Sequence, residues 1–199
     1  MKTLVQFGAG NIGRSLVGQI FSQAGWRVVF VDKIPQIVDA LNERGRYTVR
    51  IKDEIPEGSP DEVEVANVSC LACGDKEGIA EAVAAADLVG TSVGSCNLAD
   101  VMERVSRGLQ RRDAPLTVVI CENLRNAAEY VKEELAKYLP EGYELSEKVG
   151  LVETVIGKMV PTMPAEVRAR DPIEIWGEAY DKLDVDRSGF VDGVPEVPG

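Results

Sequence analysis

Three glycines near the N-terminus have the residue type and spacing of a phosphate-binding turn. They lie in the run G-A-G-N-I-G, which follows a short apolar segment and precedes a stretch with helical spacing. In a strand-turn-helix unit, the first glycine permits the tight turn, the second opens the backbone to a diphosphate, and the third lets helix and strand pack closely. Free N–H groups at the start of the helix then bind phosphate oxygens. The run therefore predicts dinucleotide binding by Gly8, Ala9, Gly10, Asn11, Ile12 and Gly13.

An acidic residue stands at the distance that ribose recognition requires. Asp32 ends the apolar segment 26–32 and follows Gly13 by 19 residues. A carboxylate at this place accepts hydrogen bonds from the adenosine ribose hydroxyls and repels a 2′-phosphate. Asp32 therefore predicts NAD rather than NADP, a preference that the neighbouring Lys33 softens, and both residues are expected at the cofactor. The alternative is a glycine turn in another kind of β-α unit that happens to have an aspartate at a strand end.

Small and polar residues also follow two later apolar segments. Segment 87–94 ends in Ser92, Val93 and Gly94, and segment 116–121 is followed by Glu122 and Asn123. Ligands of open α/β sheets bind at the carboxyl ends of the strands. We therefore expect Ser92, Val93 and Gly94 to contact the cofactor, and Asn123 to lie where nicotinamide and substrate meet. The alternative for the first group is a plain strand-to-helix turn.

The elements that position these residues alternate between strand and helix. Apolar periodicity predicts helices over 12–24, 35–45, 76–86, 98–109 and 124–139, and strands before Gly8 and over 26–32, 87–94, 116–121 and 149–156. Residues 46–72 are expected to form a hairpin-like excursion with an exposed strand at 47–51 and a loop at 53–60. This alternation predicts an α/β, Rossmann-type, doubly wound and mostly parallel sheet. We expect one NAD-binding domain over 1–199, with a core at 1–160 and a small, extended, proline-rich appendage at 161–199.

Composition excludes several classes of function. The net charge of −11 argues against a nucleic-acid partner, which requires a basic face. No apolar run approaches the roughly 18 residues of a membrane span, and the N-terminus does not resemble a signal peptide, so a cytoplasmic location is expected. The chain has no histidine. A Ser-His-Asp or Cys-His arrangement is therefore impossible, and a base would have to be Lys, Glu, Asp or Tyr.

Two further clusters favour structural interpretations. Cys70 and Cys73 form a C-x-x-C pair, but no second pair or histidine pair is present for zinc. We therefore expect no metal site and interpret all four cysteines, which include Cys96 and Cys121, as buried reduced thiols. The basic residues of the second cluster are expected on the solvated face of a helix: Arg104, Arg107, Arg111 and Arg112.

Taken in order, the motifs resemble the mannitol dehydrogenase family of polyol-specific long-chain dehydrogenases, which includes mannitol-1-phosphate 5-dehydrogenases. The resemblance rests on the segments 7–14, 87–94, 121–123, 149–153, 160–161 and 171–174. It implies the cofactor domain of an enzyme that transfers hydride reversibly between NAD and a sugar alcohol or its phosphate, of the mannitol 1-phosphate and fructose 6-phosphate type. It also places Gly8, Gly10, Asn11, Ile12 and Gly13 at the pyrophosphate, Asp32 at the ribose and Asn123 at the substrate.

The sequence departs from this family in two respects. Gly157 and Lys158 stand where many members have an Asp-Arg pair. Lys158 can still hold an anionic substrate, and it is the one candidate for a catalytic group. Family members carry their catalytic lysine in a helical second domain, so the resemblance implies that this domain is a missing partner and that the chain is inactive by itself. Two alternatives are a dinucleotide-sensing or interaction module without catalysis, and a complete short dehydrogenase that uses Lys158 as base.

Overall fold

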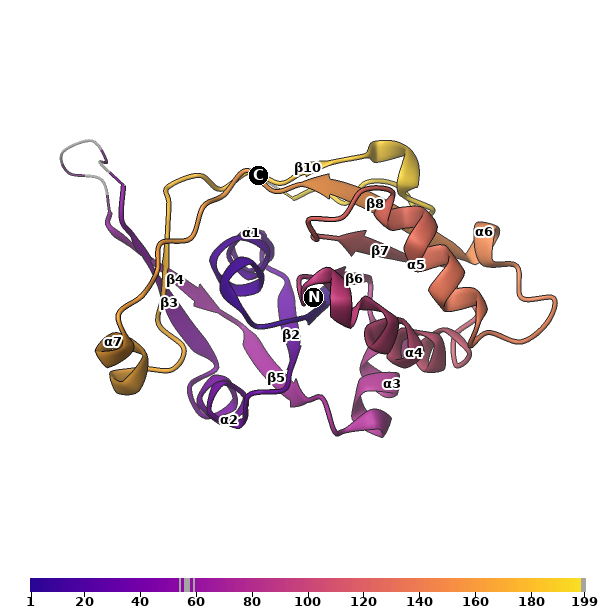
Figure 1. The fold of residues 1–199 in the computed structure, drawn as a ribbon, viewed down its shortest axis with the longest axis horizontal. Helices are drawn as coiled ribbons and strands as arrows, with labels where there is room; N and C mark the ends of the chain where they lie inside the picture. Colours follow the sequence, from indigo (N-terminus) through magenta and orange to yellow (C-terminus); the bar gives the residue numbers. More distant parts are fainter. Residues whose placement is uncertain (54, 56–57, 59, 198–199) are drawn as a thin grey trace.

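A seven-stranded sheet forms the centre of the structure (Figure 1). The computed structural model describes residues 1–53, 55, 58 and 60–197. The order is β10-β8-β7-β6-β1-β2-β5, and β10 pairs antiparallel with β8 whereas the other neighbours are parallel. The strands are β1 (Thr3–Phe7), β2 (Arg27–Asp32), β5 (Val68–Ala72), β6 (Leu88–Thr91), β7 (Leu116–Ile120), β8 (Val149–Val155) and β10 (Asp184–Val185). The chain winds outward from β1 in both directions, which confirms the predicted doubly wound fold.

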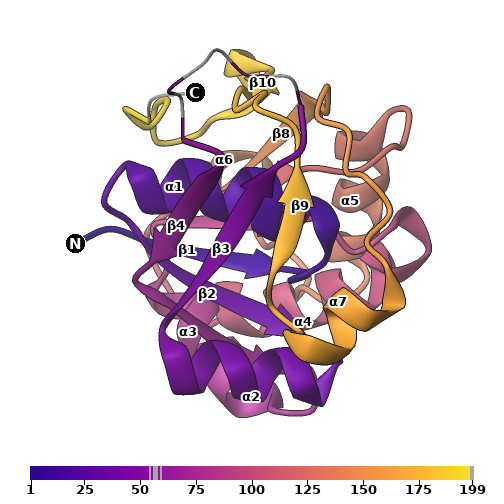
Figure 2. The ribbon, with the colours of Figure 1, turned by 90° about the vertical axis from the view of Figure 1, so that its left-hand side faces the viewer.

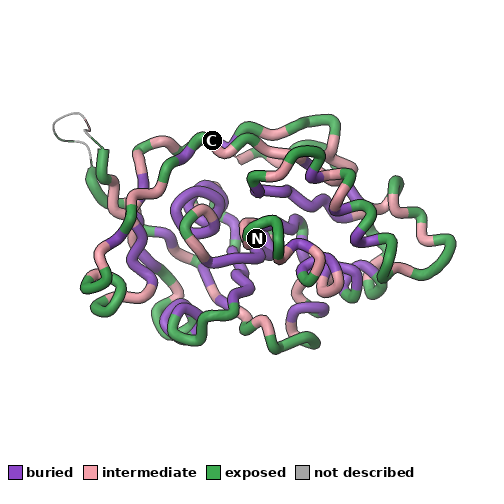
Figure 3. The backbone as a smooth tube through the Cα atoms, in the orientation of Figure 1, coloured by how far each residue is buried: buried purple, intermediate pink, exposed green. Residues whose placement is uncertain are grey.

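Helices cover both faces of this sheet, and each face has its own apolar core. They are α1 (Gln19–Gln23), α2 (Pro35–Arg44), α3 (Lys76–Ala85), α4 (Leu98–Leu109), α5 (Ala127–Ala136) and α6 (Leu145–Lys148), whereas the short α7 (Ala165–Arg170) lies apart from this sheet. Successive residues of a strand point to opposite faces. Phe30 accordingly belongs to the cluster under α1 and α2, and Val31 to the cluster under α3, α4 and α5. Figure 3 shows the buried strands at the centre and exposed residues on the outer sides of the helices.

The first helix differs from the prediction of one regular helix over 12–24. It begins as a π-helical turn, η1 (Gly13–Gly18), and continues as α1. A Cβ at Gly18 would overlap the Tyr47 hydroxyl and lie 2.7 Å from Phe30 Cζ. The same hydroxyl donates a hydrogen bond of 2.7 Å to the Arg14 carbonyl within this turn. The wide turn thus packs against a tyrosine from a distant strand, a contact that local periodicity does not reveal.

A small second sheet flanks the first (Figure 2). The hairpin of β3 (Arg46–Ile51) and β4 (Glu62–Ala66) is antiparallel, and β9 (Ile175–Gly177) adds to β3 in parallel. The predicted excursion is confirmed for the hairpin, although residues 68–72 return to the main sheet as β5. The prediction of an exposed strand at 47–51 is wrong for Tyr47 and Val49, which are buried because they face the cluster under α1. The predicted loop at 53–60 includes residues 54, 56, 57 and 59, which lie outside the described part.

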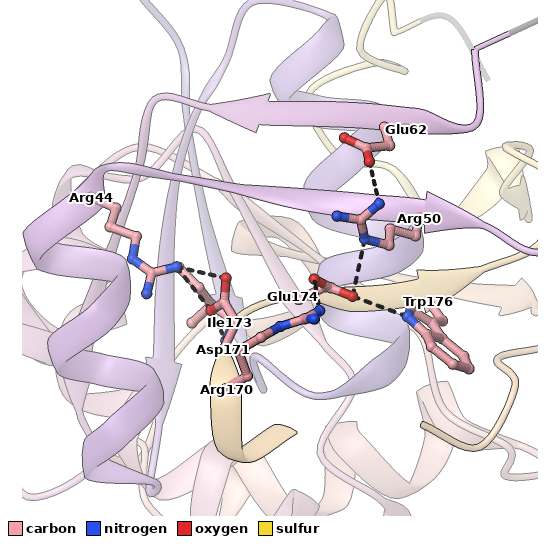
Figure 4. Close-up of polar contacts among 8 residues, drawn as sticks. All are labelled: Arg44, Arg50, Glu62, Arg170, Asp171, Ile173, Glu174 and Trp176. Atoms are coloured by element: carbon pink, nitrogen blue, oxygen red, sulfur yellow. Dashed lines mark hydrogen bonds and ion pairs between the residues drawn. The ribbon is translucent and has the colours of Figure 1, made fainter. Parts of the chain in front are cut away.

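The segment after residue 160 contains the short helix α7 and the 3-10 turn η3 (Arg187–Gly189) between extended stretches, and it contributes to the core. Met163, Ile173, Ile175 and Leu183 are buried in the cluster under α1 and α2. Their backbone is held by a polar network around the carboxylate of Glu174, drawn in Figure 4.

In that network, Glu174 forms an ion pair with Arg50 Nε at 3.0 Å. It also accepts hydrogen bonds from Trp176 Nε1 at 3.1 Å and Arg170 Nη2 at 3.3 Å. Asp171 accepts from Arg44 Nη1 at 2.8 Å. The network joins α2, β3 and β9, so the C-terminal segment is fixed to the hairpin by charge as well as by apolar contact.

The expected burial of all four cysteines holds for two of them. Cys70 and Cys121 are buried, and burial raises the pKa of both thiols to about 12. Cys73 is half-buried, however, and Cys96 is exposed because it lies in the short 3-10 turn η2 (Ser95–Asn97) after the carboxyl end of β6.

The prediction of a solvated face is wrong for Arg112. Its guanidinium is half-buried and donates to the carbonyls of Val83, Ala84, Ala86, Ala114 and Pro115.

None of the helices in the described ranges is long and apolar enough to cross a lipid bilayer.

Candidate functional site

The glycine turn lies directly after β1, between β2 and β6. Gly8 donates its N–H to the Val31 carbonyl at 2.9 Å and has a φ of +93°, a conformation that disfavours other residues. A Cβ at Gly13 would overlap the Gly8 carbonyl oxygen. Gly10 is different, because a Cβ there would meet nothing within 4 Å. Gly8 and Gly13 therefore let the turn form, whereas Gly10 keeps its outer surface clear.

Asp32 fixes the turn from the end of β2. Its Oδ2 accepts the Ala9 N–H at 2.8 Å, and its Oδ1 accepts the Ile34 N–H at 2.9 Å. In the part of the chain that the structure describes, the N–H groups of Gly10, Asn11 and Ile12 donate no hydrogen bond. A helix start thus has three backbone donors without a partner in the described chain, beside a carboxylate, an arrangement that suits a diphosphate linked to a ribose.

Two cavities flank the turn. One, of about 370 Å³, is lined by Gly8, Gly10, Asp32, Lys33, Ser92 and Val93, together with Ile34 and Arg104. The other, of about 460 Å³, is lined by Asn11, Ile12, Ser92, Gly94 and Asn123. Ser92 lies on both, so the turn and the end of β6 separate an Asp32 side from an Asn123 side. Two of the residues predicted for the cofactor, Ala9 and Gly13, are buried beneath the turn. This is the geometry of a crevice at the point where the strand order reverses.

The whole chain matches a known family in sequence. Residues 2–199 match the family model described as the mannitol dehydrogenase Rossmann domain. This chain belongs to that family. The predicted resemblance is confirmed, and the chain is the Rossmann domain of a dehydrogenase family.

Solved structures with the same fold share little sequence with this Rossmann domain. D-mandelate dehydrogenase with NADH and anilino(oxo)acetate is 15% identical, with a TM-score of 0.57, and the match covers 92% of this chain and 47% of that one. A PanE/ApbA family ketopantoate reductase from Ralstonia eutropha JMP134 is 19% identical, with a TM-score of 0.58 over 93% and 49% of the two chains. Octopine dehydrogenase with NADH and L-arginine is 14% identical, with a TM-score of 0.60 over 92% and 41%. The Rossmann domain spans about half the length of these proteins or less.

Lys158 does not line either cavity of the Rossmann domain. Its side chain is 4% exposed, and its Nζ has no hydrogen-bond partner in the described part of the chain. It lies over Gly177, where a Cβ would be 3.0 Å from Lys158 Cε and 3.4 Å from Ser15 Cβ. Burial lowers the pKa of this ammonium, and the nearby acids Asp181, Asp53 and Glu178 oppose the shift. Asn123 therefore lines the crevice, whereas Lys158 is buried outside both cavities.

Glu122 is a residue at the site that the sequence did not single out for a role. Its carboxylate is 8% exposed and accepts the Val93 N–H at 2.6 Å and the Gly94 N–H at 2.9 Å. Burial raises the pKa of this carboxyl, whereas the two N–H bonds lower it. Val93 and Gly94 line the cavities, but their N–H groups are already occupied by Glu122. The sequence signal is an acid directly after the mostly apolar segment 116–121, at an end where ligands bind.

Proposed function

We propose that this Rossmann domain binds NAD(H) and presents it for reversible hydride transfer to a sugar alcohol or sugar-alcohol phosphate, of the mannitol 1-phosphate and fructose 6-phosphate type. The observation that carries the proposal is the set of three free N–H groups at Gly10, Asn11 and Ile12 beside the Asp32 carboxylate. Membership of the mannitol dehydrogenase family supports the polyol substrate. The NADH named for two of the similar structures supports a nicotinamide cofactor.

The direction in which the cofactor lies follows from the two cavities. Asp32 and Lys33 line the cavity of about 370 Å³, where the adenosine ribose would lie and where a carboxylate disfavours a 2′-phosphate. Asn123 lines the other cavity, where its amide would meet the nicotinamide and the substrate. The match covers about half or less of the similar dehydrogenases, and the family resemblance implies a helical second domain. We therefore propose that the base for the substrate's proton lies in that domain. The chain by itself is then expected to bind cofactor without turnover.

Titration of the purified chain with NADH and NADPH tests this proposal. NADH fluorescence should show saturable binding, and NADPH should bind more weakly. Asp32→Ala should weaken the binding of NADH and reduce the difference in affinity between NADH and NADPH. Absence of NADH binding at millimolar concentration would overturn the proposal.

A dinucleotide-sensing module without catalysis is the second candidate, favoured by the burial of Lys158 away from both cavities. NADH oxidation with fructose 6-phosphate in the presence of this chain would exclude it. The same result would support Lys158 as a base, provided that Lys158→Met abolishes the oxidation.

A further inference from the structure

Arg14 is a buried cation directly beneath the glycine turn. Its side chain is 4% exposed, although an arginine is charged at every physiological pH. Its Nε donates to the Ala9 carbonyl at 2.7 Å, and its Nη1 donates to the Pro172 carbonyl at 3.3 Å. Among the described residues, no carboxylate lies within ion-pair distance of its guanidinium. Burial of this charge is costly and lowers its pKa, and the more distant carboxylates of Asp32 and Asp171 oppose the shift only in part.

The hydrogen bond to the Ala9 carbonyl sets the direction of the next N–H group. The peptide between Ala9 and Gly10 is trans, as are all described peptide bonds. In a trans peptide, the carbonyl and the N–H point to opposite sides of the chain. Because Arg14 holds the Ala9 carbonyl inward, the Gly10 N–H must face outward, where Gly10 lines the cavity next to Asp32.

The peptide between Gly8 and Ala9 is also contacted by side chains, at both its N–H and its carbonyl group. Asp32 Oδ2 accepts the Ala9 N–H, and Ser92 Oγ approaches the Gly8 carbonyl at 3.4 Å. Asp32 and Arg14 therefore orient adjacent peptides of one turn: Asp32 accepts the Ala9 N–H, and Arg14 donates to the Ala9 carbonyl from the buried side of the turn. Asp32 has a sequence signature for this place, whereas Arg14 is only the last residue of the segment 7–14.

We propose that Arg14 is a positioning residue of the diphosphate site: it orients the Gly10 N–H toward the phosphates and supplies a buried positive charge that the diphosphate balances. The inference rests on the proposed NAD(H) binding and extends it to a side chain that lines neither cavity. Replacement of Arg14 should therefore weaken the binding of a ligand that contains the diphosphate more than the binding of adenosine. A merely structural role would affect both parts alike.

Arg112 provides a matched control. Like Arg14, it donates to backbone carbonyls, and burial lowers its pKa as well, although Arg112 is only half-buried. It follows α4 and contacts the segment before β7, at the amino end of the strands and away from the glycine turn. Arg112→Met removes the same kind of group without touching the proposed site.

The experiment compares NADH, measured by fluorescence, with adenosine, measured by NMR shift titration, on the wild type and on Arg14→Met, Arg14→Lys and Arg112→Met. We expect Arg14→Met to weaken NADH by about 30-fold, the equivalent of one charge-assisted hydrogen bond, and to change adenosine by less than about two-fold. Arg14→Lys should fall between wild type and Arg14→Met, because it keeps the charge but loses the planar guanidinium. Arg112→Met should leave both affinities unchanged.

Equal weakening of NADH and adenosine, or no weakening of either, would overturn the role of Arg14. If Arg14→Met does not fold by circular dichroism, Arg14→Lys decides by the same comparison of the two ligands. Failure of the wild type to bind NADH is a separate outcome, because it would reject NAD(H) binding itself.

Discussion

Replacement of Glu122 by glutamine tests how the end of β6 is held for the cofactor. The carboxylate accepts two N–H groups, from Val93 at 2.6 Å and from Gly94 at 2.9 Å. A glutamine offers one oxygen in the same place, and its NH2 group would face the second N–H as donor against donor. Glu122→Gln therefore removes one of two charge-assisted hydrogen bonds and leaves a backbone donor unsatisfied.

The magnitude follows from these contacts. A hydrogen bond to a charged group contributes about 1.5–3 kcal/mol, and the carboxylate loses part of this to its own burial. We expect about 2 kcal/mol to be lost from the turn, which corresponds to a roughly 30-fold weaker affinity if the ordered turn is the form that binds. Val93 and Gly94 lie on different cavities, so both ends of the cofactor should be affected.

Fluorescence titration with NADH and urea unfolding measure the two consequences in one preparation. Asp87→Asn is the control, because Asp87 accepts the Thr3 N–H at 2.7 Å from just before the opposite end of the same strand, β6. It should leave the NADH affinity unchanged. An affinity of Glu122→Gln within about two-fold of wild type, with unchanged stability, would refute the reasoning, since 2 kcal/mol must appear in one of the two measurements.

Three further predictions concern buried and exposed side chains. Gly18→Ala should lower the free energy of unfolding by about 1–3 kcal/mol in urea, because its methyl group overlaps the Tyr47 hydroxyl; unchanged stability would mean that the π-helical turn relaxes freely. Lys158→Met should be more stable than wild type near pH 7, since it removes a buried ammonium that has no hydrogen-bond partner among the described residues. Burial lowers the Lys158 pKa in the folded chain, so the free energy of unfolding of the wild type should rise with pH between that pKa and about 10.4, the unfolded value. The difference in unfolding free energy between Lys158→Met and wild type should therefore narrow toward pH 10, and a pH-independent difference would contradict this. Ellman's reagent should label Cys96 first in the native chain, and Cys96→Ser should abolish that fast phase; a fast phase that persists would show that the half-buried Cys73 or a buried thiol reacts as fast as Cys96, against this prediction.

The features that the sequence predicted are those with local signatures. The periodicity of 98–109 predicted α4 with its observed bounds, and Pro35 and Gly45 marked the two ends of α2. The glycine turn and Asp32 were also recognisable, since their spacing is fixed by one strand-turn-helix-strand unit. In each case the physical cause lies within about 20 residues of chain.

The features that escaped prediction depend on partners far apart in the sequence. The π-helical turn requires Tyr47, and the burial of Lys158 requires Gly177, which lets the lysine side chain pass over the backbone. Arg112 was expected in solvent because it follows an amphipathic helix, but carbonyls near α3 accept its hydrogen bonds. A charged residue in a helical pattern indicates exposure only when no distant carbonyl is positioned to replace water.

The same distinction applies within the glycine turn. Its glycines explain why the backbone can take this path, since two of them exclude a Cβ and the third leaves an open surface. They do not determine which way each peptide faces, because a glycine can rotate more freely than any other residue. The orientation of the N–H groups comes from side chains that hold the opposite ends of the same peptides, Asp32 at the Ala9 N–H and Arg14 at the Ala9 carbonyl. A phosphate-binding turn of this kind is therefore expected to lose affinity when either side chain is removed, even if every glycine remains.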